Sequence, residues 1–346
     1  MSEINIKDIA KLSGVGVSTV SRVINNHPDV NPATKERILK IIRDNHYVPN
    51  NSARNLKRSD STAIALLVKG TSNTFFTEMI ECMQREVKKR KYSTVLQSVG
   101  FDEDESKVAL ELVKEKRLRG IIFLGGSFVN SGNRLKELGV PYVMSTTGSK
   151  GSMPRDFSED HFSSVTVDDV AESFRMTEYL IGLGHKRIVI ITAAADDTSE
   201  GMLRLQGYRE ALLKHGIAYD ESLVLHMDPE LEDYSAENGY KVMKQFLDNG
   251  GKCTAVFAIS DTLAFGAMRA IHDAGFSVPG DISIAGFDGI KAGQYFIPSL
   301  TTIKQPIAEM SKASIDILFG LIDGEGINKH EIYRGEFIER ESTGKS

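Results

Sequence analysis

The sequence predicts an α/β protein with a three-helix head, a short polar linker and a body of two lobes. Two short helical patterns flank a glycine-containing turn near the start of the chain. A third helical pattern comes after them and is followed by a basic, polar stretch. From Ala63 onward, strand-sized apolar runs alternate with helical patterns in two successive series. Such alternation produces parallel sheets with helices on both faces, and two series predict two lobes.

The head begins with two helices, predicted between Ile4 and Asn25. Apolar residues recur at helical spacing on both sides of the segment Ser13-Gly14-Val15-Gly16, whose glycines tolerate a tight turn. Asn5 is placed to cap the first helix. Two short helices joined in this way form a helix-turn-helix candidate, although the pattern alone also fits any antiparallel helix pair.

A third helix is predicted after Asn31, which can cap it, and Pro32, whose fixed φ suits the first helical position. The segment Tyr47-Val48-Pro49 ends this helix, because the residue before a proline avoids helical geometry. Residues 1–60 hold ten basic and six acidic side chains, a net charge of +4, so the remainder must carry −9 to give the total of −5. The head (residues 1–49) and the linker after it are therefore basic, while the body is acidic, which indicates that only this first part of the chain meets a polyanion.

The body shows a regular succession of strand and helix patterns. The predicted strands cover residues 63–68, 92–99, 121–124, 142–145, 165–167, 187–192, 223–226, 255–259, 282–287, 300–303 and 331–338. The predicted helices lie around residues 79–87, 106–116, 133–138, 169–183, 201–215, 234–249 and 261–274, with a long helix after residue 303. Because strand-like runs continue after the second series, we expect the chain to return through both lobes.

Composition and missing motifs exclude several classes of function. Two cysteines in 346 residues do not form a disulfide framework, and no Cys or His cluster indicates a metal. No apolar run is long enough to cross a bilayer and the N-terminus has no signal-peptide pattern, so we expect a cytoplasmic location. No G-x-G-x-x-G motif follows a strand, no P-loop occurs and no catalytic constellation is evident, which argues against an enzyme and against a cofactor.

Polar and aromatic residues follow several predicted strands of the body. In open α/β sheets, ligands bind beyond the carboxyl ends of the strands, which makes these residues candidates for a binding site. They are Phe75, Phe76, Asp168, Asp169, Ser260, Asp261, Asp288 and Gln305. Two alternatives stay open: Asp261 can cap its helix, and the two phenylalanines can belong to the core.

The head resembles the DNA-binding domain of the lactose-repressor (LacI/GalR) family of bacterial regulators, in the segments NIKDIAKLSGVGVSTVSRVINN and VNPATKERILKIIRDNHYVPNNSARNLKR. The resemblance implies that the second helix enters the major groove of DNA, where Val17, Ser18 and Arg22 touch base edges and Asn25 adds a contact. An arginine can bind both acceptors of a guanine, which agrees with this role, while a phosphate contact is the alternative for Arg22. Gly16 stands where the family usually has a capping serine, and glycine caps nearly as well.

Residues 50–61 form the polar, basic stretch between head and body. A flexible linker is the simplest interpretation. The resemblance implies a hinge helix that folds on operator DNA, packs against its dimer mate and inserts Leu56 into the minor groove, with Ala53 and Lys57 as further DNA contacts. An isolated apolar side chain among basic ones is what such a wedge requires.

For the body, the resemblance implies two lobes like those of periplasmic binding proteins, joined by three crossovers near residues 163, 290 and 323, with the effector in the cleft between them. Lobe 1 is then expected at residues 62–162 plus 291–323, lobe 2 at 163–290 plus 324–340, and a polar tail at 341–346. The family's RxxGY, GFD and LTTIKQ motifs match residues 204–208, 286–288 and 300–305. The implied effector-binding residues are Phe75, Phe76, Arg204, Ser260, Asp261, Asp288 and Gln305.

Head and body together predict a homodimeric transcriptional regulator. The resemblance implies a repressor of carbohydrate-utilisation genes that binds a near-palindromic operator in double-stranded DNA and responds to a sugar or a related metabolite. It leaves open whether the effector induces or corepresses. Two other classes remain as alternatives, a sugar-binding receptor with no DNA role and a cytosolic α/β enzyme.

Overall fold

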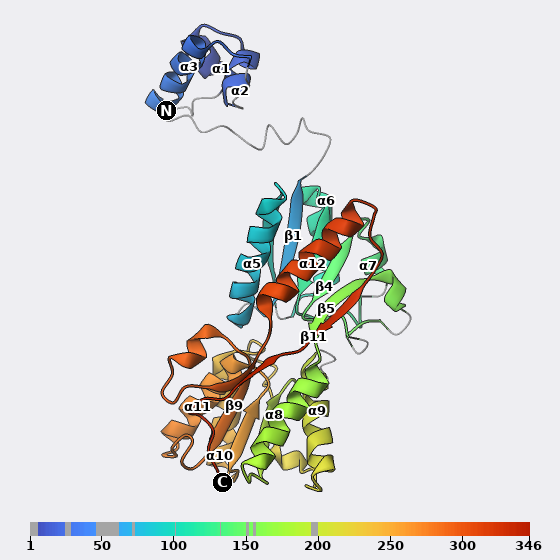
Figure 1. Cartoon of the computed structure of the whole chain (residues 1–346), viewed down its shortest axis with the longest axis vertical. Coiled ribbons are helices and arrows are strands. Elements are labelled where there is room, and N and C mark those ends of the chain that lie inside the picture. The colour runs from blue at the N-terminus through green and yellow to red at the C-terminus, as the bar shows by residue number, and fades with distance from the viewer. Residues whose placement is uncertain are drawn as a thin grey trace. The chain divides into compact units, whose positions relative to one another are not determined.

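The computed structural model describes residues 6–24, 29–45, 62–70, 73–100, 102–131, 133–149, 152–154, 157–194 and 200–346. The chain divides into two compact units, residues 1–61 and 62–346 (Figure 1). Several sequence-based assignments lie outside the described residues: Asn5, Asn25, the helix end at Tyr47-Val48-Pro49, and the linker or hinge at residues 50–61 with Ala53, Leu56 and Lys57. Within those ranges, no helix has the length and apolar character that a membrane crossing requires.

The head contains three helices, α1 (Ile6–Ser13), α2 (Val17–Ile24) and α3 (Pro32–Asp44). They close over a small core to which each contributes, with Ile9, Val20, Val23 and Ile38 almost fully buried. The predicted cap of α3 is present, because the Asn31 side chain accepts a hydrogen bond from the Ala33 amide at 3.0 Å. The helix-turn-helix arrangement predicted from the sequence is therefore confirmed.

Lobe 1 is built on a six-stranded sheet in the order β11-β5-β4-β3-β1-β2, whose neighbouring strands all run parallel. Its strands are β1 (Ala63–Lys69), β2 (Ser93–Val99), β3 (Gly120–Leu124), β4 (Tyr142–Ser145), β5 (Ser163–Val167) and β11 (His330–Tyr333). Its helices are α5 (Phe75–Lys89), α6 (Glu105–Lys116), α7 (Arg134–Glu137) and α12 (Ile307–Ile322), with the 3₁₀ turn η1 (Glu159–His161).

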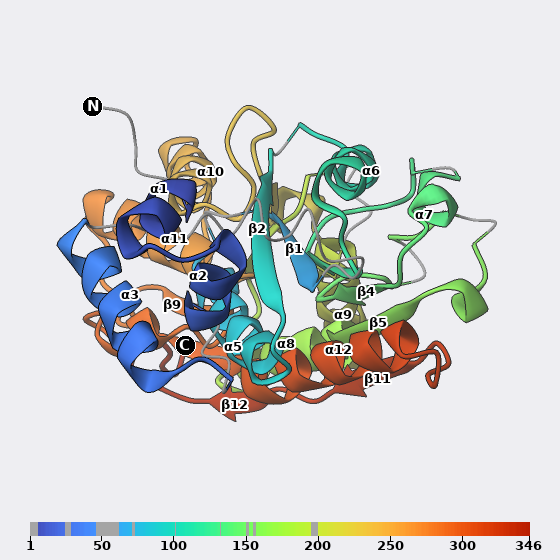
Figure 2. The ribbon, with the colours of Figure 1, turned by 90° about the horizontal axis from the view of Figure 1, so that it is seen from above.

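The faces of this sheet are covered by different helices. Side chains alternate along β1, so that Leu66 and Val68 join a cluster with residues of α5 and α12, while Ala65 and Leu67 join one with residues of α6 and α7. Figure 2 shows α6 and α7 on the opposite side of the strands from α5 and α12. Apolar residues on both faces explain why β1 reads as a continuous apolar run in the sequence.

Lobe 2 repeats this topology in the order β12-β10-β9-β8-β6-β7. Its strands are β6 (Ile188–Thr192), β7 (Val224–His226), β8 (Ala255–Ala258), β9 (Ser283–Asp288), β10 (Thr301–Lys304) and β12 (Glu336–Ile338), of which β12 runs antiparallel to β10. Its helices are α8 (Asp169–Gly182), α9 (Glu200–Lys214), α10 (Ala236–Asp248) and α11 (Asp261–Asp273), with the 3₁₀ turns η2 (Glu221–Leu223) and η3 (Lys291–Gln294). The prediction of two parallel-sheet lobes flanked by helices is confirmed.

The expected lobe boundaries need correction at all three crossovers. Strand β5 was expected to open lobe 2, but it pairs with β4 and β11 in lobe 1, so the first crossing follows Val167. Strand β10 pairs with β9 in lobe 2, so the second crossing lies after Lys304 and not near residue 290. The third lies between Tyr333 and Glu336. A strand's apolar pattern shows that it is buried, but it does not show which sheet it joins.

The first and third crossovers are hydrogen-bonded to each other. The Asp168 amide donates to the carbonyl oxygen of Tyr333 at 3.1 Å. One turn into α8, the Glu172 carboxylate accepts from the Gly335 amide at 2.9 Å, and Arg175 donates to the Gly335 carbonyl oxygen at 3.0 Å. Two of the three connections between the lobes thus run side by side as a bonded pair.

Helix pairs in lobe 2 approach one another through glycine. A Cβ added at Gly207 on α9 would collide with the Val170 carbonyl oxygen on α8, and one added at Gly266 on α11 would collide with the Ala236 carbonyl oxygen on α10. Only a residue without a side chain allows backbones to pack this closely.

The end of the chain packs against lobe 2, where the sequence predicted only a polar tail. Ser342 is fully buried, and its hydroxyl donates to the Ile284 carbonyl oxygen at 2.6 Å. His185 is also buried, with its ring nitrogens 3.0 Å from the Thr254 hydroxyl and from the Gly344 carbonyl oxygen. These bonds satisfy polar groups that burial would otherwise leave unpaired.

Candidate functional site

One candidate site is the exposed face of α2 in the head. Val20 and Val23 are buried against α1 and α3, which leaves Val17, Ser18 and Arg22 accessible. All three residues that the resemblance places in the major groove are thus exposed on the second helix of the motif.

Arg22 has a partner that the sequence did not indicate. Its guanidinium lies 3.2 Å from the Asp29 carboxylate, and the two side chains are 59% and 47% exposed. Exposed ion pairs contribute little to stability, so DNA can replace Asp29 as the partner of Arg22 at small cost.

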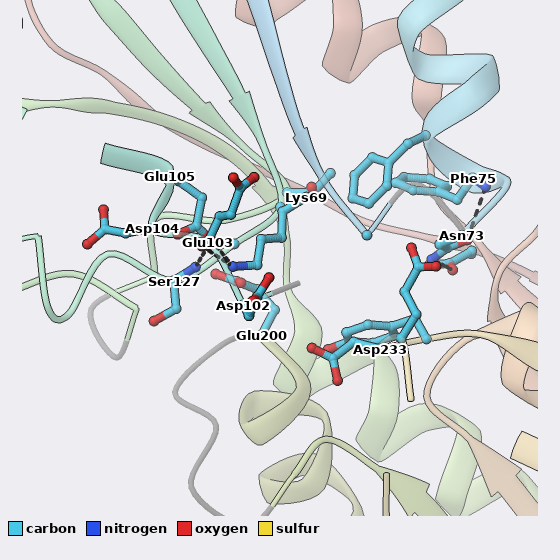
Figure 3. Close-up of a pocket in the computed structure, with 18 of the residues that line it drawn as sticks. Lys69, Asn73, Phe75, Asp102, Glu103, Asp104, Glu105, Ser127, Glu200 and Asp233 are labelled. Atoms are coloured by element: carbon cyan, nitrogen blue, oxygen red, sulfur yellow. Dashed lines mark hydrogen bonds and ion pairs between the residues drawn. The ribbon is translucent and has the colours of Figure 1, made fainter. Parts of the chain in front are cut away.

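The second candidate site is a cavity of about 390 Å³ in the body. Both lobes line it, mostly with residues that follow the carboxyl ends of strands. The lining residues are Lys69, Gly70, Asn73, Phe75, Phe76, Asp102, Glu103, Asp104, Glu105, Gly125, Gly126, Ser127, Asn130, Ser131, Thr146, Glu200, Arg204, Glu232, Asp233, Tyr234, Asp288 and Gln305. Figure 3 shows the acidic segment 102–105 beside Lys69 and Ser127, on the other side of the view from Asn73 and Phe75.

Arg204 organises the side of the cavity that lobe 2 provides. Its Nε donates to Asp169 at 2.7 Å, and one terminal nitrogen donates to the Ile259 carbonyl oxygen at 2.6 Å and lies 3.7 Å from Asp288. The guanidinium also stacks over the Phe287 ring, 3.8 Å from its centroid. An arginine that is almost fully buried is tolerated here because charged, polar and aromatic partners surround it.

Asp288 joins the two lobes at the cavity wall. It ends β9 with a φ of 115°, and its carboxylate accepts from Gln305 at 2.8 Å and from Asn73 of lobe 1 at 3.0 Å. Burial raises the pKa of Asp288 to about 6, although the nearby Arg204 charge acts in the opposite direction. A ligand that competes with Asn73 for Asp288 therefore alters a direct contact between the lobes.

The two phenylalanines line the cavity and also pack within lobe 1. Phe75 is 2% exposed and belongs to the core of lobe 1, yet it also lines the cavity beside Phe76. The rings meet edge to face with centroids 5.5 Å apart. They give the cavity an apolar surface of the kind that packs against a sugar ring.

Ser260 and Asp261, which were expected to bind effector, lie instead within lobe 2. Both are fully buried and neither lines the cavity. The Ser260 hydroxyl caps α11 by accepting from the Leu263 amide at 3.2 Å, so the cap suspected of Asp261 falls one residue earlier. Asp261 accepts from the Thr302 hydroxyl at 2.6 Å and from the Ile290 amide at 2.8 Å, which ties three segments of the lobe together.

Several lining residues were not identified from the sequence. Thr146 and Ser131 follow strands of lobe 1, and the segment 102–105 follows β2, so the rule of strand carboxyl ends could have found them.

Glu200, at the start of α9, lies well beyond the end of β6, and the sequence analysis did not single it out. Its carboxylate accepts from the Ser149 amide and the Ser152 hydroxyl of lobe 1, both at 3.3 Å. Burial, and then the Asp169 charge, raise its pKa to about 7. Glu200 is therefore a second contact between the lobes at the cavity wall.

Each of the two units of the chain matches a known kind of domain. Residues 5–50 match the model for bacterial regulatory proteins of the lacI family, and residues 177–343 match that for a periplasmic binding protein-like domain. The chain is 39% identical to the HTH-type transcriptional regulator MalR of Clostridium butyricum, covering 98% of each chain. It is 31% identical to the ribose operon repressor of Haemophilus influenzae, covering 96% of this chain and 95% of the relative.

A solved structure extends the likeness to three dimensions. The transcriptional regulator CelR in complex with cellobiose superposes with a TM-score of 0.72 at 30% identity, covering 98% of this chain and 99% of that one. Sequence identity over nearly the full length, together with a matching head and body, shows to which family the chain belongs. The chain belongs to the lacI family of bacterial regulatory proteins, and it is a DNA-binding transcriptional regulator rather than an enzyme.

Proposed function

We propose that this regulator is a homodimeric cytoplasmic repressor of carbohydrate-utilisation genes, controlled by a sugar bound in the cavity between the lobes. Val17, Ser18 and Arg22 read the operator, with Asn25, Ala53, Leu56 and Lys57 as further DNA contacts. Two heads then bind the half-sites of a near-palindrome, as a two-fold symmetric dimer requires. The relatives support this proposal, since one is named as the ribose operon repressor and another is solved with cellobiose.

The hydrogen bond between Asn73 and Asp288 carries the allosteric part of the proposal. It connects the lobes directly, and both residues line the cavity. Sugar hydroxyls that bind Asp288, Gln305 or Arg204 compete with this contact or extend it, so the sugar has different affinities for different lobe arrangements. A ligand shifts a conformational equilibrium only through such a difference. By linkage, a sugar that weakens operator binding is itself bound more weakly in the presence of operator.

Operator binding by the full chain, followed by fluorescence anisotropy with and without added sugars, tests the proposal. A labelled duplex from the DNA upstream of its own gene serves as probe, and maltose, cellobiose, ribose and glucose serve as effectors. We expect at least one sugar to change operator affinity at least about fivefold, which corresponds to the lower range of allosteric coupling, roughly 1 kcal/mol. The direction of the change distinguishes induction from corepression.

The variant Asp288→Asn is expected to bind operator normally and to lose this response. Asp273→Asn is the matched control, because Asp273 lies in the same lobe at the surface, where it pairs with Arg269. If sugars release Asp288→Asn as they release the wild type, the effector does not act through this cavity.

A further inference from the structure

Two side chains from different segments of the head meet at its exposed surface. Arg22 lies in the last turn of α2, and its Nη1 atom is 3.2 Å from the carboxylate of Asp29, which precedes α3. Both side chains are exposed, so burial does not force them together. The acid is therefore a specific neighbour of the arginine that the resemblance places in the major groove.

The core of the head fixes the backbone on both sides of this pair. Val20 and Val23, on either side of Arg22 in the sequence, are buried among the three helices. Val30 packs against the same core, and the Asn31 side chain caps α3. Because both backbones are already held, what the ion pair restricts is the side-chain conformation of Arg22.

The pair leaves one edge of the guanidinium available. A guanidinium presents five N–H donors in one plane, and Asp29 faces only Nη1. Among the residues that the structure describes, none forms a hydrogen bond or ion pair with the edge made by Nε and Nη2. Two neighbouring donors of an arginine match the N7 and O6 acceptors of guanine. Arg22 therefore does not have to give up Asp29 in order to bind a base.

The charge of Asp29 also distinguishes the two DNA contacts that are open to Arg22. A phosphate bound to this guanidinium would lie close to the carboxylate, and the two negative charges would repel each other. The acceptors of a guanine carry no net charge, so a base contact does not meet this repulsion. An arginine held beside an acid is consequently better suited to a base than to the DNA backbone.

We infer that Asp29 is a positioning residue for operator recognition, which holds Arg22 with its free edge toward a guanine and disfavours a phosphate contact. This inference rests on the proposed function, in which Arg22 reads a base, and adds one residue to it. Asp29 itself does not touch the base. Without Asp29, the Arg22 side chain would exchange between base and phosphate, and it would discriminate less between base pairs.

Binding of the full chain to a set of operator duplexes tests the inference. The set is made from the DNA upstream of the protein's own gene by changing one base pair at a time in one half-site. Fluorescence anisotropy gives the discrimination at each position, which is the ratio of the affinities for the unchanged and the changed duplex. Arg22→Ala identifies the base pair that Arg22 reads, because discrimination there should fall by roughly 5- to 150-fold.

At that base pair, Asp29→Asn should lower discrimination by about two- to fivefold, the size expected for an exposed ion pair. Discrimination at the other base pairs should match that of the wild type. In a chain that already carries Arg22→Ala, Asp29→Asn should have no further effect at this position, because the side chain that it positions is gone.

Asp44→Asn is the matched control, because it removes the same charge from another exposed acid of the head. Asp44 ends α3, a helix of 13 residues, and so lies about 20 Å along the helix axis from the Asp29 end. This variant should keep the discrimination of the wild type at every base pair. Thermal melting checks that each variant is folded.

Unchanged discrimination in Asp29→Asn, an equal loss at every base pair, or a loss that persists in the Arg22→Ala chain would overturn the inference. Each of these results leaves the base contact of Arg22 in place. If Arg22→Ala loses no discrimination at any base pair, the base contact in the proposed function fails, and the inference fails with it.

Discussion

The two lobes of the body share one strand order but differ in how they finish the strands that face the cavity. In lobe 2, the strand ends hold a buried network in which Arg204, Asp169, Asp288 and Gln305 satisfy one another. In lobe 1, the corresponding ends hold surface acids and hydroxyls, two of which lack partners among the described residues. A repeated fold thus fixes where a site lies, while a few residues at the strand ends decide whether that side is complete before ligand arrives.

Removing the cation from each side of the cavity should produce the largest difference between the lobes. Arg204→Met leaves Asp169 and Asp288 buried without their common partner, and breaking a buried charge pair in this way typically costs about 3–5 kcal/mol. Lys69→Met removes the partner of a single carboxylate, Glu105, which keeps its hydrogen bond from the Ser127 amide, so we expect a smaller loss of about 1.5 kcal/mol. Urea denaturation at neutral pH measures the loss of unfolding free energy in each variant. Equal losses in the two variants would contradict the expected difference between the lobes.

The contact of Glu200 with lobe 1 should make stability depend on pH. Because its folded pKa of about 7 exceeds the ordinary value of 4.5, the folded state holds this proton more tightly, and the unfolding free energy falls as pH rises from about 4.5 to 7. The fall attributable to Glu200 is at most about 3 kcal/mol, since one pKa unit corresponds to 1.36 kcal/mol.

Glu200→Gln should therefore flatten the stability profile in this window, measured by urea midpoints at pH 5 and pH 8. Asp288, whose pKa is also raised, keeps part of the slope in the variant. A profile as steep as that of the wild type would show that Glu200 is not held as a buried acid between the lobes.

Replacing one closely packed glycine by alanine in each lobe should give a smaller difference in stability between the two variants. Gly207→Ala in lobe 2 drives a Cβ into the Val170 carbonyl oxygen, and overpacking against backbone typically costs about 1–3 kcal/mol. Gly120→Ala in lobe 1 meets side-chain atoms and no backbone: Leu318 at 2.9 Å and the methyl end of Ile322 at 3.2 Å, which can shift. Melting temperatures should fall further for Gly207→Ala, and the reverse order would mean that the helix pair α8–α9 yields more easily than the core of lobe 1.

Most of the fold could be predicted from the sequence, because apolar runs and helical spacing are local properties of the chain. The lobe to which β5, β10 and β11 belong could not, since sheet membership depends on contacts between distant segments. The rule that ligands bind beyond strand ends led to Phe75, Asp288 and Gln305, which line the cavity. It failed at Ser260 and Asp261, because the first residues of a helix are often used within the fold as caps and cross-links.

The bonded pair of crossovers sets the kind of motion that the effector can drive. Asp168 and Tyr333 are joined by a backbone hydrogen bond, and Gly335 is held by Glu172 and Arg175, so these two connections cannot slide past each other without losing those bonds. The pair therefore resists sliding of one connection along the other, but it can bend. Bending across this pair keeps the bonds, so we expect a hinge rotation of one lobe against the other to be the motion that an effector drives.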